Sequence, residues 1–134
     1  MNDLTCTFIS LWRFNRSGFF NFKTMNILFI CSRNKWRSPT AEKIYKQSAG
    51  FNVKSAGTEA GARIKINAKL IDWSDIIFAM EKKHKQRLTE NFPSQTSTKK
   101  IIVLDIPDEY EYMNPELIDM LKISVSSYLN NIEE

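Results

Sequence analysis

The apolar run Met25-Asn-Ile-Leu-Phe-Ile30 leads directly into the segment Cys31-Ser-Arg-Asn-Lys-Trp-Arg37-Ser38-Pro39. The run predicts a buried strand, because continuous apolar residues suit a parallel strand that is covered on both faces. Ser38 and Pro39 predict the start of a helix, with Ser38 as its N-cap and Pro39 at its first position. Loop amides that converge in front of a helix N-terminus bind anions. The segment between the two elements is therefore a candidate phosphate-binding loop.

The side chains of this loop fit phosphoryl transfer. Cys31 lies at the expected strand end, where its thiolate could attack phosphorus and form a covalent intermediate. Arg37 supplies a planar guanidinium that can bind two phosphoryl oxygens. The Ser38 hydroxyl can donate to the sulfur and favour its charged form. The spacing of Cys and Arg can also arise by chance, so the alternative is a buried structural Cys beside solvated loop charges.

The rest of the chain alternates between strand and helix patterns. Apolar runs over residues 76–80 and 101–104 predict two further buried strands, and the alternation over residues 51–55 predicts an edge strand. We expect helices over residues 39–49, 67–73, 81–91 and 115–130, and a loop over residues 94–100. This order predicts a doubly wound α/β domain, with a four-stranded parallel sheet of order 2-1-3-4 and helices on both faces. The ligand site of such a domain lies at the carboxyl ends of its strands, where Cys31 is expected.

Further segments support a resemblance to a known family. They are Val53-Lys-Ser55-Ala-Gly57-Thr58, Trp73-Ser-Asp-Ile-Ile-Phe-Ala-Met80-Glu81, Asp105-Ile-Pro107-Asp108-Glu-Tyr110 and Asn114-Pro115-Glu-Leu. With the Cys31 loop, they make residues 25–134 resemble the low-molecular-weight protein tyrosine phosphatases, and especially a short, single-domain subgroup. The resemblance implies a cysteine phosphatase that hydrolyses phosphate monoesters through a cysteinyl-phosphate, with protein phosphotyrosine as the expected substrate.

The resemblance also implies roles for single residues. Cys31, Arg37 and Asp108 are the expected catalytic residues, with Asp108 as the general acid. Asp105 competes for that role. The family places its acid directly before Pro-Tyr, and here Glu109 takes the position of the Pro.

Other residues are expected to bind the phosphoryl group or to support the loop. The expected phosphate-binding residues are Ser32, Arg33, Asn34, Lys35, Trp36, Arg37 and Ser38. Asn34 and Ser55 would hydrogen-bond to each other and hold the loop, with ordinary turn chemistry as the alternative. Trp36 and Tyr110, together with Tyr112, could form a slot for a phosphotyrosine ring, with core packing as the alternative. His84, the only histidine, is expected to pack on the inner face of a helix and not to pair with Cys31.

Composition narrows the function classes. The 134 residues are 43% hydrophobic and 25% charged with a net charge of +4, as in an ordinary globular protein without a dense basic patch. We therefore expect no nucleic-acid partner, and no apolar run reaches the ~18 residues that span a membrane. Two cysteines cannot form a disulfide scaffold, and a thiol nucleophile fits a reducing cytoplasm. We expect a monomer without metal or cofactor, whose partner is a phosphoprotein or a small phosphomonoester.

We interpret residues 1–24 as a non-family extension, disordered or, alternatively, an aromatic-rich arm for a membrane or a partner, and residues 25–134 as the phosphatase-like domain. The alternative function is a catalytically weak pseudo-phosphatase that binds phosphate or a phosphoprotein, because the acid loop is altered. An arsenate reductase on the same scaffold would need further cysteines, and residues 32–134 contain none.

Overall fold

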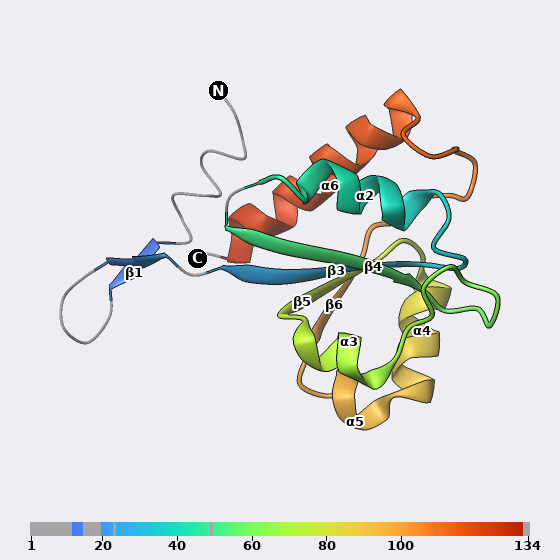
Figure 1. The fold of residues 1–134 in the computed structure, drawn as a ribbon, viewed down its shortest axis with the longest axis horizontal. Helices are drawn as coiled ribbons and strands as arrows, with labels where there is room; N and C mark the ends of the chain where they lie inside the picture. Colours follow the sequence, from blue (N-terminus) through green and yellow to red (C-terminus); the bar gives the residue numbers. More distant parts are fainter. Residues whose placement is uncertain (1–11, 15–19, 23, 49, 133–134) are drawn as a thin grey trace.

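The computed structural model describes residues 12–14, 20–22, 24–48 and 50–132 (Figure 1). Most of the predicted extension at residues 1–24 therefore lies outside the described residues. Within it, two short strands, β1 (Trp12–Phe14) and β2 (Phe20–Phe22), pair with each other in antiparallel register. The sequence prediction did not include this hairpin.

A four-stranded parallel sheet forms the centre of the domain (Figure 1). Its strands are β3 (Met25–Cys31), β4 (Phe51–Gly57), β5 (Ile76–Ala79) and β6 (Lys100–Val103). They lie in the order β4-β3-β5-β6, and each neighbouring pair is parallel. This is the predicted order 2-1-3-4, and β4 lies at an edge as its alternating sequence indicates.

Helices cover both faces of the sheet. On one face lie α2 (Arg37–Tyr45) and α6 (Pro115–Ile132), and on the other lie α3 (Ala68–Trp73), α4 (Lys82–Asn91) and α5 (Pro93–Thr96) (Figure 1). The prediction of a loop over residues 94–100 is wrong at both ends, because α5 extends to Thr96 and β6 begins at Lys100. Pro93 at the first position of α5 has no N–H to leave unpaired, and the Thr96 hydroxyl donates to the Phe92 carbonyl. No helix in the described part of the chain is long and apolar enough to cross a membrane.

The start of α2 also corrects the sequence prediction. The helix begins at Arg37, two residues before the predicted start, and its N-cap position is Trp36 and not Ser38. The first intrahelical bond runs from the Thr40 N–H to the Trp36 carbonyl over 3.1 Å. Ser38 therefore lies inside the first turn, where its hydroxyl is free to bond elsewhere. The helix ends at Tyr45, earlier than the predicted residue 49.

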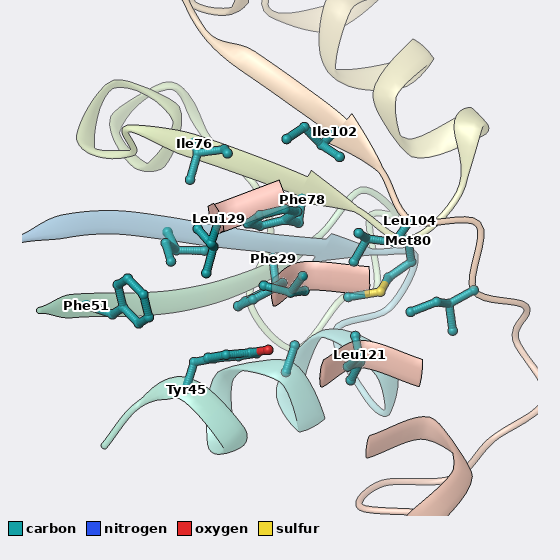
Figure 2. Packing of buried hydrophobic residues seen from close by; sticks show 14 of the residues in the cluster. Phe29, Tyr45, Phe51, Ile76, Phe78, Met80, Ile102, Leu104, Leu121 and Leu129 are labelled. Atoms are coloured by element: carbon teal, nitrogen blue, oxygen red, sulfur yellow. The ribbon is translucent and has the colours of Figure 1, made fainter. Parts of the chain in front are cut away.

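The alternation of side chains along β3 divides the core into two layers. Met25, Ile27 and Phe29 pack in the cluster that includes residues of α2 and α6, whereas Leu28 and Ile30 pack toward α3 and α4. Figure 2 shows Phe29 between Tyr45 of α2 and Phe78 of β5, and both pairs of rings are stacked. α6 contributes buried side chains at four-residue spacing: Leu117, Leu121, Val125 and Leu129. By the same alternation, Cys31 at the end of β3 belongs to the α2 and α6 side.

Candidate active site

The loop that follows β3 lies at the carboxyl end of the sheet, between β3 and the start of α2. Three of its polar side chains are withdrawn from solvent, with exposed fractions of 0% for Asn34, 2% for Arg37 and 0% for Ser38. Asn34 has a φ of 56°, in the left-handed region that Asn tolerates better than most residues. Buried polar side chains need hydrogen-bond partners, and these partners define the site.

A chain of hydrogen bonds runs from Cys31 to the edge strand. The Asn34 amide nitrogen donates to the hydroxyls of Ser38 and Ser55, each over 2.8 Å. Since the Ser38 oxygen accepts from Asn34, its own proton is free for the Cys31 sulfur, which lies 2.9 Å away. Ser55 in turn donates to a carboxylate oxygen of Glu42 over 2.5 Å. The contacts expected for Asn34, Ser38 and Ser55 are therefore present, and they orient a donor toward the thiol.

The backbone of the loop is held by the segment after β4. The carbonyls of Cys31, Ser32 and Arg33 accept from the N–H groups of residues 58, 59 and 63, at 3.0, 2.9 and 3.0 Å. Among the described residues, no acceptor faces the N–H groups of residues 32–36. A run of unpaired N–H groups in front of a helix N-terminus is a site for an anion.

Gly57 makes this bracing possible. A Cβ atom at this position would lie 2.6 Å from the Ser32 carbonyl oxygen and 2.9 Å from the Asn34 nitrogen. The end of β4 therefore approaches the loop more closely than any residue with a side chain could. The sequence prediction included Gly57 in a family-like turn but did not give it this role.

Arg37 is anchored on one side and open on the other. Its Nη1 donates to Glu81 over 2.5 Å and to the Ile106 carbonyl over 2.8 Å. No hydrogen bond within the described residues uses Nε or Nη2, and Nε lies 3.6 Å from an oxygen of Asp108. A guanidinium has five N–H donors, so this arrangement leaves the edge formed by Nε and Nη2 for two further acceptors. Burial raises the pKa of Glu81, but the hydrogen bond and charge of Arg37 outweigh it, and the net pKa lies below its usual value.

His84 joins α4 to the loop. Its Nδ1 accepts from the Glu81 backbone N–H over 3.0 Å, so the ring proton of the neutral form lies on Nε2, which donates to the Ser32 hydroxyl over 2.8 Å. Burial, with a smaller contribution from the charge of Arg37, lowers the pKa of His84 to about 4. The histidine is packed, as the sequence predicts. Its lowered pKa and its contact with the Ser32 hydroxyl, which supports the loop, were not predicted.

A small cavity opens above Cys31. Its volume is about 60 Å³, far below the several hundred Å³ of a drug-sized pocket, so it suits a small anion. The residues that line it are Cys31, Ser32, Arg33, Lys35, Trp36, Arg37 and Asp108. Asp105, the competing acid, lies in a separate hollow beside Glu81, Lys82 and Lys83. Of the two carboxylates, Asp108 is the one that shares the cavity with the thiol.

The predicted aromatic slot is only partly assembled. Trp36 lines the cavity, but Tyr110 does not. Tyr110 packs against the core cluster of β3 and α6, and partial burial together with the Glu116 carboxylate raises the pKa of its hydroxyl. Tyr112 lines a larger neighbouring groove that shares Trp36 and Lys35 with the cavity.

Sequence reasoning missed the partners that hold Arg37. Glu81 was included in a family-like segment without a role, and the Ile106 carbonyl belongs to an apolar residue that carries no sequence signal. The one available signal was the position of Glu81 directly after the third strand of the sheet, where side chains at the carboxyl ends converge. Within the described residues, no group of three or more His, Cys, Asp or Glu side chains is placed to hold a metal ion.

Part of the chain is similar in sequence to known proteins. The family model described as low molecular weight phosphotyrosine protein phosphatase matches residues 26–69, the part that contains most of β3, the loop, α2 and β4. A protein-arginine-phosphatase of Geobacillus stearothermophilus is 34% identical, and the match covers 50% of this chain. The match spans 62% of that relative's length, less than two thirds.

Solved structures extend the similarity to most of the chain. The low molecular weight protein tyrosine phosphatase SP-PTP of Streptococcus pyogenes matches with a TM-score of 0.68 and 19% identity, over 81% of this chain and 93% of that one. The tyrosine phosphatase Wzb of Escherichia coli K30, in complex with phosphate, matches with a TM-score of 0.66 and 19% identity, over 81% and 98%. At these identities the similarity establishes the fold.

Proposed function

We propose that the chain is a cysteine phosphatase of phosphate monoesters. The match of residues 26–69 to the family model of low molecular weight phosphotyrosine protein phosphatases supports this proposal, as the sequence resemblance predicts. One observation carries the proposal: a thiol with a hydroxyl 2.9 Å away lies in a small cavity with an arginine edge and a carboxylate.

In the first step, the Cys31 thiolate attacks phosphorus and the bond to the leaving oxygen breaks. The Ser38 proton favours the thiolate before the attack. The N–H groups of residues 32–36 and the Nε and Nη2 edge of Arg37 bind the phosphoryl oxygens. Because these donors are fixed before the substrate arrives, they stabilise the transition-state charge without reorganisation.

Asp108 gives its proton to the leaving oxygen in the same step. In the second step, Asp108 takes a proton from water, the water oxygen attacks phosphorus, and the sulfur–phosphorus bond breaks. Inorganic phosphate and the thiolate are the products. The contact between Asp108 and Arg37 Nε, over 3.6 Å, supports this role, because Nε is one of the donors proposed for the phosphoryl oxygens.

Phosphotyrosine is the proposed substrate. Three cationic side chains and one carboxylate line the cavity, which favours a dianionic phosphoryl group on an uncharged ring. Phosphoarginine is the second candidate because of the similarity to a protein-arginine-phosphatase. Its guanidinium would bring positive charge toward Arg33 and Lys35, which disfavours it.

Hydrolysis of para-nitrophenyl phosphate by the full chain, beside Cys31→Ser, tests the activity. We expect turnover by the unchanged protein and none by Cys31→Ser. Binding of inorganic phosphate without turnover in either protein would instead support the alternative, a phosphate-binding pseudo-phosphatase. Two peptides of one sequence, with phosphotyrosine or phosphoarginine, then compare kcat/KM. A higher value for phosphoarginine would overturn the proposed substrate.

A further inference from the structure

A second hollow adjoins the catalytic cavity. It has a volume of about 590 Å³ and shares Lys35 and Trp36 with the cavity. Its other lining residues are Pro39, Glu42, Lys43, Lys46, Arg63 and Tyr112. We call it the basic groove. It begins where the phosphoryl site ends, so a polypeptide that places one residue in the cavity must pass over it or away from it.

The charge of the basic groove is strongly one-sided. Four of its side chains, Lys35, Lys43, Lys46 and Arg63, are cationic and exposed. The one carboxylate, Glu42, is half-buried and engaged, because it accepts from the Ser55 hydroxyl that supports the loop. The groove therefore carries a net positive charge, and its one carboxylate is already hydrogen-bonded to Ser55.

The cations differ in how far they are already committed. Arg63 Nε donates to the Asn34 carbonyl over 3.2 Å, and Lys35 Nζ lies 5.0 Å from the centre of the Trp36 ring. Lys43 and Lys46 have no carboxylate within ion-pair distance among the described side chains. These two lysines remain open to an external anionic group.

Lys43 lies on α2 and Lys46 at its C-cap, and Figure 1 shows this helix on the face of the sheet opposite α3 and α4. Pro39, Glu42, Lys43 and Lys46 follow the spacing i, i+3, i+4, i+7, which places them on a single helix face. From Pro39 to Lys46 this face runs for about 10 Å, at ~1.5 Å per residue. An extended peptide covers that length with about three residues.

We propose that the basic groove binds an acidic segment of the phosphoprotein substrate, with Asp or Glu about two to four residues from the phosphorylated one. The inference rests on the proposed phosphatase function and adds the sequence context of its substrate. Exposed ion pairs contribute little individually, so the groove selects among substrates and accelerates their encounter more than it stabilises one complex.

Paired peptides test the proposal. Each pair carries one phosphotyrosine and differs only in Glu or Gln at positions two to four on its N-terminal or C-terminal side. We expect the Glu peptide of one pair to have a kcat/KM about 3- to 10-fold higher at low salt, with the preference fading at high salt. The double variant Lys43→Glu, Lys46→Glu should abolish or invert the preference and leave hydrolysis of para-nitrophenyl phosphate unchanged.

A matched control distinguishes the effect of the basic groove on substrate preference from the effect of the protein's net charge. The double variant Lys69→Glu, Lys85→Glu changes two exposed lysines on α3 and α4, across the sheet, by the same total charge. It should retain the preference for Glu. Equal kcat/KM values within both peptide pairs, with para-nitrophenyl phosphate still hydrolysed, would overturn the inference and leave the phosphatase function intact. If no substrate is turned over, fluorescence anisotropy measures binding of the labelled peptides instead. Tighter binding of the Glu peptide, lost in the variant Lys43→Glu, Lys46→Glu, would support the inference. Equal binding of the Glu and Gln peptides would overturn it.

Discussion

The loop at residues 31–38 and the segment at residues 105–112 contribute different sides of one cavity, yet they are held in different ways. In the loop, the Arg37 side chain is 2% exposed and has two acceptors besides the contact with Asp108. In the later segment, Asp108 is 57% exposed, and within the described part of the chain its one ion pair is with Arg37 Nε. The backbone anchor of this segment is Ile106, whose N–H donates to Met80 and whose carbonyl accepts from Arg37.

This difference separates two tasks. The groups proposed to bind the phosphoryl oxygens are fixed by burial and by hydrogen bonds within the protein. The proposed proton donor lies on an exposed segment that is joined to the site through one buried residue. Anion binding should therefore depend on the surrounding fold, whereas proton transfer should depend on a single carboxyl group.

Arg37→Lys should have the largest effect. One ammonium cannot donate to Glu81 and Ile106 and also present a flat two-donor edge to the phosphoryl group. We expect kcat/KM for para-nitrophenyl phosphate to fall by roughly 10³-fold, measured by steady-state kinetics. Arg33→Lys, at an exposed rim position, is the control and should stay within about twofold. If Arg37→Lys retains most of its activity, a positive charge at this position is sufficient for catalysis and the two-donor edge of the guanidinium is not required.

Asp108→Asn should have the next largest effect, and one that depends on the leaving group. We expect kcat for phenyl phosphate to fall by roughly 10²-fold. The loss should be smaller for para-nitrophenyl phosphate, because its leaving group needs no proton. Asp105→Asn is a matched control, since Asp105 has a φ of 56° that Asn also tolerates. If Asp105→Asn abolishes turnover and Asp108→Asn does not, the acid is Asp105.

Gly57→Ala should disturb the loop from behind. The added methyl would meet the Ser32 carbonyl oxygen at 2.6 Å, so either the strand end or the loop must move. We expect a loss of roughly 1–3 kcal/mol in the free energy of unfolding, together with lower phosphate affinity. Gly61→Ala, where a Cβ has no atom within 4 Å, should change neither. Equal behaviour of the two variants in denaturant titrations would contradict the bracing role.

The pH dependence of stability should report His84. Its pKa of about 4 in the folded state lies below the unfolded value of 6.5, so the unfolded chain binds the proton more tightly. The contribution of His84 to the free energy of unfolding is therefore complete above pH ~6.5 and is lost as the pH falls toward 4. Between pH 7.5 and 5 we expect the free energy of unfolding to fall by about 2 kcal/mol. Urea titrations at both pH values measure this loss.

Two substitutions separate the contacts of His84. His84→Asn can still accept from the Glu81 N–H but is too short for Ser32, whereas His84→Gln can reach Ser32. Both should flatten the pH dependence, because neither side chain titrates. Asn should weaken phosphate binding more than Gln, because only Gln restores support to the loop. An unchanged pH dependence in both variants would assign the loss of stability to other groups.

Sequence patterns predicted the frame of the domain well for a physical reason. The strands at Met25–Cys31 and Ile76–Ala79 are buried on both faces. In a domain of this size, a short continuous apolar run indicates a strand of this kind. The order of the sheet, its edge strand and the position of the loop at its carboxyl end were confirmed. The loop was recognised from three residues close together in the chain, which strand–loop–helix geometry keeps close in space.

What the sequence did not predict depends on approaches between distant segments. The contact of Gly57 with Ser32 arises from the register of two parallel strands, and a backbone carbonyl such as that of Ile106 has no residue type to identify it. Ser38 was assigned as an N-cap from local preference alone. In the structure the first turn begins earlier, and the hydroxyl bonds to Cys31 and Asn34 instead.

The alternation along β3 has a consequence for insertions and deletions. Phe29 and Cys31 face the same layer because two residues separate them, while Ile30 between them faces the other. One residue added or removed after Phe29 would keep every strand in the sheet but turn the sulfur toward α3 and α4. Chain length within this single strand is thus a requirement of the chemistry, independent of which apolar residues fill it.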